Sequence, residues 1–153
     1  MNSIKNSTLI LENPKINIKL KLSAIWITLM FLYIYKDILS LFRPGAIESI
    51  LAGFMGPFSV TQVALLQATI LMIIPAVMVL LSLTLKPNIN RWTNVIVGSL
   101  FVLVNIATQI GETWVYYWLF GVVEIILTIL IVWYAWKWPR YKNNYGQEDE
   151  RKK

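Results

Sequence analysis

The chain has 153 residues, of which 57% are hydrophobic and 14% charged, and it carries a formal net charge of +6 at pH 7. A soluble domain usually has about 25% charged residues, so most of this chain is expected to lie in lipid. It contains neither cysteine nor histidine, which excludes disulfides, thiol redox chemistry, Ser-His-Asp triads and ordinary zinc sites. No motif for a metal site or a cofactor stands out, and neither is expected.

Four stretches are apolar and long enough to cross a bilayer as helices, for which roughly 20 residues each are needed. They cover about residues 22–42, 60–85, 95–110 and 115–138. A chain of this length cannot surround four apolar helices with polar ones, which excludes the buried helices of a soluble protein. The stretch from Ala46 to Gly56 is too short to span and is expected to be a short interfacial segment. The sequence therefore predicts an all-α membrane protein, a four-transmembrane-helix bundle over residues 22–138.

The basic residues are placed unevenly along the chain. Twelve of the fourteen precede the first span, lie between the second and third spans, or follow the fourth. With four crossings these regions share one face of the membrane, and the positive-inside rule puts that face, with both termini, in the cytoplasm. Residues 1–21 are then a cytoplasmic basic arm, and residues 139–153 are a cytoplasmic polar tail. Polar and apolar residues alternate over residues 15–22, which predicts an extended arm or a short strand there. Because the charge follows topology, no nucleic-acid partner is expected.

Polar side chains are scarce inside the spans, and ionisable groups there usually face protein or a water-filled cavity. The candidates for lining such a cavity are Tyr33, Lys36, Asp37, Gln67, Asn105, Gln109, Tyr117 and Glu124. They lie at similar depths in the outer half of the membrane, whereas the inner halves look almost entirely apolar. The pattern predicts a polar cavity that opens outward, in which Lys36 pairs with Glu124 or Asp37. Each residue alone is also compatible with helix packing or with snorkelling to the headgroups.

The run from Lys86 reads Lys-Pro-Asn-Ile-Asn-Arg-Trp-Thr-Asn, and its first six residues form the predicted connection between the second and third spans. Together with the stretch Tyr33 to Asp37, Gly56-Pro57 and Glu124, this run resembles a family of small bacterial four-span integral membrane proteins of unknown function, loosely similar to the DoxX-like group. The resemblance covers about residues 13–140. It implies the four-span topology and a bacterial cytoplasmic (inner) membrane location, and it implies no activity and no catalytic residue.

Two functions remain open on this pattern. In the first, the cavity transports or conducts a cation, a proton or a small amphipathic molecule. In the second, the bundle binds a lipid or quinone, or serves as an accessory subunit, without turnover. An enzyme that uses Asp37, Glu112 or Glu124 as a general acid or base is not expected, because no nucleophile–base pair or metal cluster accompanies them. The expected partners are membrane lipids, an ion or small-molecule ligand, and further copies of the chain.

Overall fold

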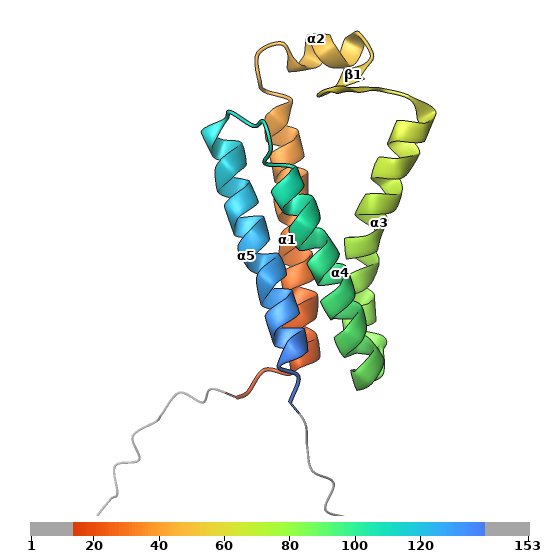
Figure 1. The fold of residues 1–153 in the computed structure, drawn as a ribbon, viewed down its shortest axis with the longest axis vertical. Helices are drawn as coiled ribbons and strands as arrows, with labels where there is room; N and C mark the ends of the chain where they lie inside the picture. The colour runs from red at the N-terminus through yellow and green to blue at the C-terminus, as the bar shows by residue number, and fades with distance from the viewer. Residues whose placement is uncertain (1–13, 140–153) are drawn as a thin grey trace, which may run out of the picture.

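Four long helices run side by side and form the body of the molecule (Figure 1). They are α1 (Ile18–Ser40), α3 (Gln62–Thr84), α4 (Pro87–Ala107) and α5 (Val115–Trp136). The computed structural model describes residues 14–139, and the rest of the predicted arm and tail lies outside the described residues. Each of the four helices is long and apolar enough to cross a membrane. The predicted all-α four-span fold is confirmed, and the chain is a multi-pass membrane protein.

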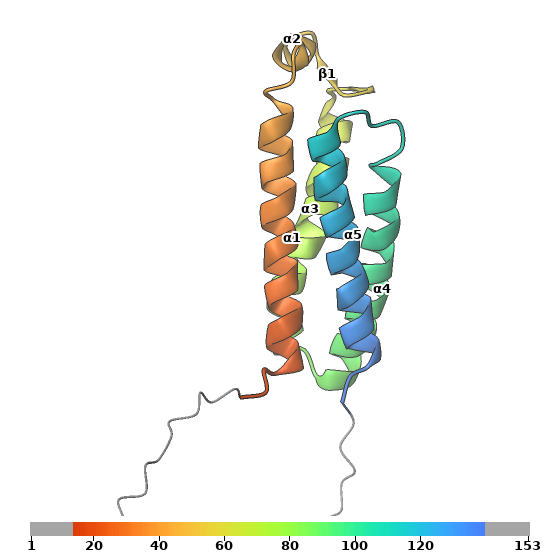
Figure 2. The ribbon, with the colours of Figure 1, turned by 90° about the vertical axis from the view of Figure 1, so that its left-hand side faces the viewer.

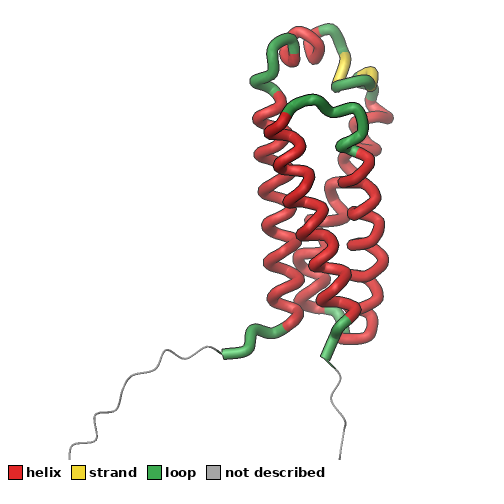
Figure 3. The backbone as a smooth tube through the Cα atoms, turned by 60° about the vertical axis from the view of Figure 1, so that its left-hand side comes forward, coloured by secondary structure: helices red, strands yellow, loops and turns green. Residues whose placement is uncertain are grey.

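The bundle has two ends, which we name by the segments that they carry. The terminal end carries the start of α1, the tight turn between α3 and α4, and the end of α5. Both described ends of the chain leave the bundle there (Figures 1 and 3). The distal end carries the connection between α1 and α3 and the loop between α4 and α5. This placement is the one that four consecutive crossings require.

Helix α3 joins the bundle through only part of its length. Its buried residues are Pro75, Met78 and Ser82, which lie toward the terminal end. None of the residues 62–73, all of them described, is buried. Figure 1 shows α3 diverging from α1 and α4 toward the distal end, while Figure 2 shows α5 beside both α1 and α4. The distal half of the interior is therefore built by α1, α4 and α5.

The apolar core lies between the four helices and receives buried side chains from each of them. Its buried members are Leu22, Trp26, Leu29, Tyr33, Met78, Phe101 and Ile131. Trp26 and Phe101 meet edge to face, with their ring centroids 5.8 Å apart, a preferred aromatic geometry. On α1 the buried positions recur every three or four residues and continue to Lys36. The same face that packs the core thus carries a charged residue toward the distal end.

The connection from α1 to α3 is compact. It contains the short helix α2 (Ala46–Leu51) and a hairpin of β1 (Phe54–Met55) and β2 (Phe58–Ser59), which pair antiparallel. Gly45 precedes α2 with φ at 78°, a left-handed conformation that glycine adopts readily. Leu51 and Phe58 are 83% and 66% exposed. The predicted short segment exists, and it consists of a helix followed by a hairpin.

Two predicted boundaries were wrong. Residues 15–22 are not an extended arm, because α1 begins at Ile18 and the side chain of Asn17 caps it by accepting from the N–H of Lys19 at 2.9 Å. The helix that contains the predicted third span begins before residue 95, because α4 starts at Pro87. Proline suits the first turn of a helix, where its missing N–H leaves no hydrogen bond unmade. The predicted connection from Lys86 is therefore largely the first turns of α4.

Candidate functional site

A buried ion pair between α1 and α5 lies in the distal half of the bundle. Nζ of Lys36 donates to Oε2 of Glu124 at 2.6 Å. Lys36 is 5% exposed and Glu124 is 0% exposed. Of the two predicted partners of Lys36, the structure selects Glu124. Because helix spans contain few ionisable groups and these are costly in lipid, this pair is the strongest functional pointer in the chain.

Two tyrosine rings surround the lysine ammonium. Nζ of Lys36 lies 4.8 Å from the ring centroid of Tyr117 and 5.5 Å from that of Tyr33. Both distances are within the range of favourable cation–π contacts. The hydroxyl of Tyr33 donates in turn to Oδ1 of Asn105 at 3.0 Å. One carboxylate, two aromatic rings and one amide, from three helices, therefore form a single cluster around the Lys36 ammonium, which we call the distal cluster.

Gln109, in the turn that follows α4, lies beside the distal cluster. It is 5% exposed, and its amide lies against Gly121 of α5, where an added Cβ would be only 2.0 Å from Nε2 of Gln109. The hydroxyl of Thr108 donates to the carbonyl oxygen of Asn105 at 2.9 Å and accepts from Nε2 of Gln109 at 3.3 Å. Since that hydroxyl proton is already used, the nitrogen end of the amide must face Thr108. The free end of the amide is therefore its oxygen.

Several buried polar atoms in or beside the distal cluster make no hydrogen bond within residues 14–139. They are Oε1 of Glu124, Oε1 of Gln109 and Nδ2 of Asn105. Buried polar groups are nearly always paired, and an unpaired group costs about 1–3 kcal/mol. The distal cluster and Gln109 thus keep two acceptors and one donor that their own side chains do not satisfy.

A second ion pair lies at the distal end of the bundle. Nη1 and Nη2 of Arg43 donate to Oε1 and Oε2 of Glu112 at 3.2 and 3.1 Å, and Nε donates to the hydroxyl of Tyr116 at 2.5 Å. The guanidinium also stacks 5.0 Å from the ring centroid of Tyr117, so this ring contacts both Lys36 and Arg43. We call the Arg43–Glu112 pair the distal clasp. It ties the end of α1 to the α4–α5 loop.

The electrostatics of the distal clasp favour its charged form. Partial burial acts to raise the pKa of Glu112, but hydrogen bonds from the backbone N–H of Trp114 and from Arg43 outweigh it and hold the pKa below its ordinary value. Glu112 therefore stays ionised, and the clasp stays paired, throughout the neutral range.

Two of the predicted cavity-lining residues lie outside the distal cluster. Asp37 is exposed, because it is about 100° around α1 from Lys36 and so leaves the buried face. Gln67 is exposed as well, because the part of α3 that carries it does not pack into the bundle. Of the predicted set, the cluster itself brings together Tyr33, Lys36, Asn105, Tyr117 and Glu124, with Gln109 beside it.

The sequence predicts an almost entirely apolar interior in the terminal half of the bundle. The structure instead places a group of hydrogen-bonded polar side chains there. Nε1 of Trp26 donates to Oδ1 of Asn94 at 2.8 Å, and the hydroxyl of Ser82 donates to the same oxygen at 3.3 Å. Nδ2 of Asn94 donates to Oδ1 of Asn90 at 2.7 Å, and Nδ2 of Asn90 donates to the carbonyl oxygen of Ser82 at 2.6 Å. These four buried residues form the terminal cluster, which joins α1, α3 and α4.

The spacing of α4 contains the signal that would have revealed the terminal cluster. Its buried residues are Asn90, Asn94, Gly98, Phe101 and Asn105, which recur every three or four positions along one face. If the sequence analysis had started this helix at Pro87 instead of near residue 95, the same spacing would have placed Asn90 and Asn94 on one face with Asn105.

An apolar layer separates the two clusters. Leu29, Phe101 and Ile131 are each 0–2% exposed and lie between them on α1, α4 and α5. Asn94 and Asn105 are about 16 Å apart along α4 at the usual helical rise. With Glu124 fully buried, the distal cluster is closed in this structure. The predicted outward-open cavity therefore stays a prediction.

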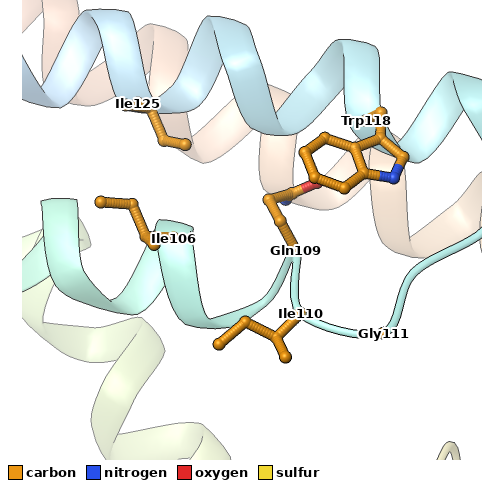
Figure 4. A pocket seen from close by; sticks show the side chains of 6 residues that line it. All are labelled: Ile106, Gln109, Ile110, Gly111, Trp118 and Ile125. Atoms are coloured by element: carbon orange, nitrogen blue, oxygen red, sulfur yellow. The ribbon is translucent and has the colours of Figure 1, made fainter.

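A shallow groove of about 360 Å³ runs between α4 and α5 near the distal end (Figure 4). It is lined by Ile106, Gln109, Ile110, Gly111, Trp118 and Ile125. Ile110 is 81% exposed, so the groove faces outward from the bundle, toward lipid in a membrane. Gln109 is the one polar side chain among these lining residues, and it connects the groove to the distal cluster.

The chain belongs to DUF6326, a family of unknown function, and the match covers residues 10–145. No curated protein and no solved structure matches the chain.

Proposed function

We propose that this DUF6326 protein transports protons or small cations across the membrane. In this proposal the carboxylate of Glu124 binds the transported species, and the ammonium of Lys36 competes with it for that position. The observation that supports the proposal is the buried contact of 2.6 Å between Lys36 and Glu124 inside the apolar bundle.

Stability alone gives no reason for a buried ion pair. Replacing such a pair by apolar side chains of similar size is often neutral or even stabilising, because desolvation of the two charges offsets their attraction. Ionisable groups inside membrane spans commonly mark ion pathways or proton relays. Because the Lys36–Glu124 pair adds little net stability, its presence is better explained if one partner is exchanged for a transported ion.

The cluster offers a simple exchange. When a proton or cation binds Glu124, the positive charge of Lys36 is no longer balanced, so its ammonium must leave or lose a proton. The Lys36 side chain is long and flexible, and the adjoining Tyr117 ring, 4.8 Å away, also contacts Arg43 nearer the distal end. Return of Lys36 to Glu124 would then expel the bound species.

A route through the bundle would use the two clusters and the layer between them. The terminal cluster supplies polar groups in the half that the sequence had suggested to be apolar. Leu29, Phe101 and Ile131 separate the clusters, so transport requires these side chains to move and let the clusters communicate in turn. A closed state such as this one is what prevents a free leak.

Flux in liposomes tests the proposal. Purified protein is reconstituted with an internal pH-sensitive dye, and proton entry is followed under a pH gradient, with and without a sodium or potassium gradient. We expect flux in the wild type and its loss in Glu124→Gln. Asp37→Asn is the matched control, because it removes a carboxylate from a neighbouring exposed position and should retain flux. Equal flux in the wild type and Glu124→Gln, or none in either, contradicts the proposal.

We further propose that the terminal end faces the cytoplasm of a bacterial cell, in its inner membrane. The support is the concentration of basic residues in the regions that the sequence assigns to that side. The chain has no cysteine, so single cysteines at Glu48 and at Asn88 can be compared with an impermeant thiol reagent on intact cells. We expect the reagent to label the cysteine at position 48 first. Faster labelling at position 88 would show that the orientation is the opposite of the one proposed.

A second candidate function is the binding of a lipid or another amphipathic molecule without turnover. The observation that favours it is the groove of about 360 Å³ between α4 and α5, which is apolar except for Gln109. Ile106→Phe would fill the groove, whereas Ile96→Phe makes the same change at an exposed position of the same helix. Loss of a co-purified lipid in the first variant only would support this function. An unchanged lipid content in both variants would exclude the groove as its site.

A further inference from the structure

The groups that surround the Lys36 ammonium, namely Glu124, Tyr33 and Tyr117, have the composition of a binding site for an organic ammonium group. We call this site the seat. A carboxylate oxygen lies 2.6 Å from the nitrogen, and two tyrosine ring centroids lie 4.8 and 5.5 Å from it. The carboxylate gives charge and a hydrogen-bond acceptor, and the rings give faces of negative potential. All three lie on helices, and Glu124 and Tyr33 are buried, which strengthens electrostatic attraction.

The site around the Lys36 ammonium also has an acceptor that Lys36 does not use. An ammonium group has three N–H donors, and Lys36 makes one hydrogen bond, to Oε2 of Glu124. Among the described residues, Oε1 of the same Glu124 is a buried acceptor without a partner. A free primary ammonium, which no stem ties to α1, can turn a second N–H group toward that oxygen. The cluster therefore satisfies a mobile ammonium better than it satisfies its own lysine.

Alkali cations fit this seat less well. Sodium and potassium are surrounded by several oxygen ligands when they bind proteins, and the rings of Tyr33 and Tyr117 occupy two sides of this site with carbon faces. Cation–π attraction is instead well suited to ammonium groups. Selection for an alkylammonium over an alkali cation follows from this mixture of one carboxylate and two rings.

We propose that the species that competes with Lys36 for Glu124 is a small primary alkylammonium ion, the protonated form of a small amine. This inference rests on the proposed transport function and names the chemical class of its substrate. The side chain of Lys36 is itself an alkylammonium, and the structure shows it in place as a built-in analogue of that substrate. The bond between seat and substrate is non-covalent, so no reaction step is involved.

Chemical rescue tests the proposal without any measurement of transport. Lys36→Ala removes the alkylammonium and leaves the seat, and its thermal unfolding in detergent micelles is followed as n-propylammonium chloride is added. We expect a saturable rise in Tm, with a half-saturating concentration about tenfold lower than for potassium chloride, the size of a cation–π contribution. Neutral 1-propanol, which matches the amine in size, should give no saturable rise. Tetramethylammonium, a cation without N–H donors, should be weaker than propylammonium.

The site is assigned by the same titration in the double variant Lys36→Ala/Glu124→Gln, where the rise should vanish. Equal effects of propylammonium and potassium, or a rise that survives Glu124→Gln, would overturn the proposal. If Lys36→Ala does not fold, uptake of radiolabelled methylamine into liposomes gives the answer in wild type against Glu124→Gln, with Asp37→Asn as control. Proton flux that depends on Glu124 without any response to amines would refute this inference and leave the proposed transport function standing.

Discussion

The side-chain amide of Gln109 occupies the space that the missing side chain of Gly121 leaves open on α5. A Cβ at residue 121 would lie 2.0 Å from Nε2 and 2.2 Å from Cδ of Gln109, well inside van der Waals contact. The glycine thus allows a polar side chain from the α4–α5 loop to lie buried against α5, one helical turn before Glu124. This contact holds one wall of the distal cluster.

Gly121→Ala should therefore displace Gln109. We expect the free energy of unfolding in detergent micelles to fall by about 1–3 kcal/mol, the usual effect of overpacking a close contact. Val122→Ala is the control, because Val122 is exposed on the same helix, and it should change stability by less than about 0.5 kcal/mol. Adding Gln109→Ala to Gly121→Ala removes the clashing atoms and should restore much of the loss. A Gly121→Ala protein as stable as wild type would show that the amide of Gln109 moves aside freely and that this contact contributes nothing to stability.

The Lys36–Glu124 pair predicts strong coupling between its two positions. Lys36→Met leaves a carboxylate buried without its counter-charge and should lower the free energy of unfolding by about 3–5 kcal/mol. The double variant Lys36→Met/Glu124→Gln carries no charge in the seat and should recover most of that loss. A double-mutant cycle with Glu124→Gln gives the coupling directly. Additive effects of the two single changes would mean that the two side chains do not interact.

The terminal cluster predicts that Asn94 is a stabilising residue. Asn94→Leu removes the acceptor of the Trp26 indole N–H and of the Ser82 hydroxyl, and a buried donor left without a partner costs about 1–3 kcal/mol. Asn88→Leu makes the same change at an exposed position in the first turn of α4 and should be nearly neutral. Unfolding curves in detergent compare the two. Similar stability of both variants would count against the hydrogen bonds.

The distal clasp predicts a specific dependence on pH. The pKa of Glu112 in the folded protein is below its ordinary value of 4.5. A carboxyl group with a lowered pKa stabilises the folded state above that ordinary value, and this contribution disappears as the pH falls through the lowered pKa. The stability difference between wild type and Glu112→Gln should therefore be constant near neutral pH and shrink below about pH 4.5. A difference that grows on acidification would contradict the sign of this shift.

Much of the distal cluster could be predicted because polar residues are rare in these spans. Once the spans were recognised, helical spacing placed Asn105 and Gln109 on one face of α4 and placed Tyr117 and Glu124 on one face of α5. The long side chain of Lys36 then allowed this residue, placed nearer the outer surface, to reach as deep as Glu124. The structure agrees for Asn105, Tyr117, Glu124 and Lys36, whereas Gln109 lies in the turn that follows α4.

The remaining features depend on helix rotation and packing, which polarity does not specify. Asp37 and Lys36 are adjacent in sequence, and only the buried face of α1 decides which of them turns inward. The prediction for Gln67 was wrong because the sequence of α3 does not show that this helix leaves the bundle toward the distal end. The terminal cluster was missed because Asn90 and Asn94 follow a Lys-Pro-Asn run that is typical of a loop. Their hydrogen bonds to each other, to Trp26 and to Ser82 make these asparagines compatible with a buried helix.

The central claim, that Glu124 is the group that exchanges its lysine partner for a transported proton or cation, is tested most directly by infrared difference spectroscopy in lipid bilayers. Spectra are recorded for the wild type between neutral and acidic pH, and with and without an added cation. We predict a carboxyl stretching band that responds to one of these changes, disappears in Glu124→Gln and persists in Asp37→Asn. Identical difference spectra of the wild type and Glu124→Gln would show that Glu124 keeps one state throughout, and would contradict the claim.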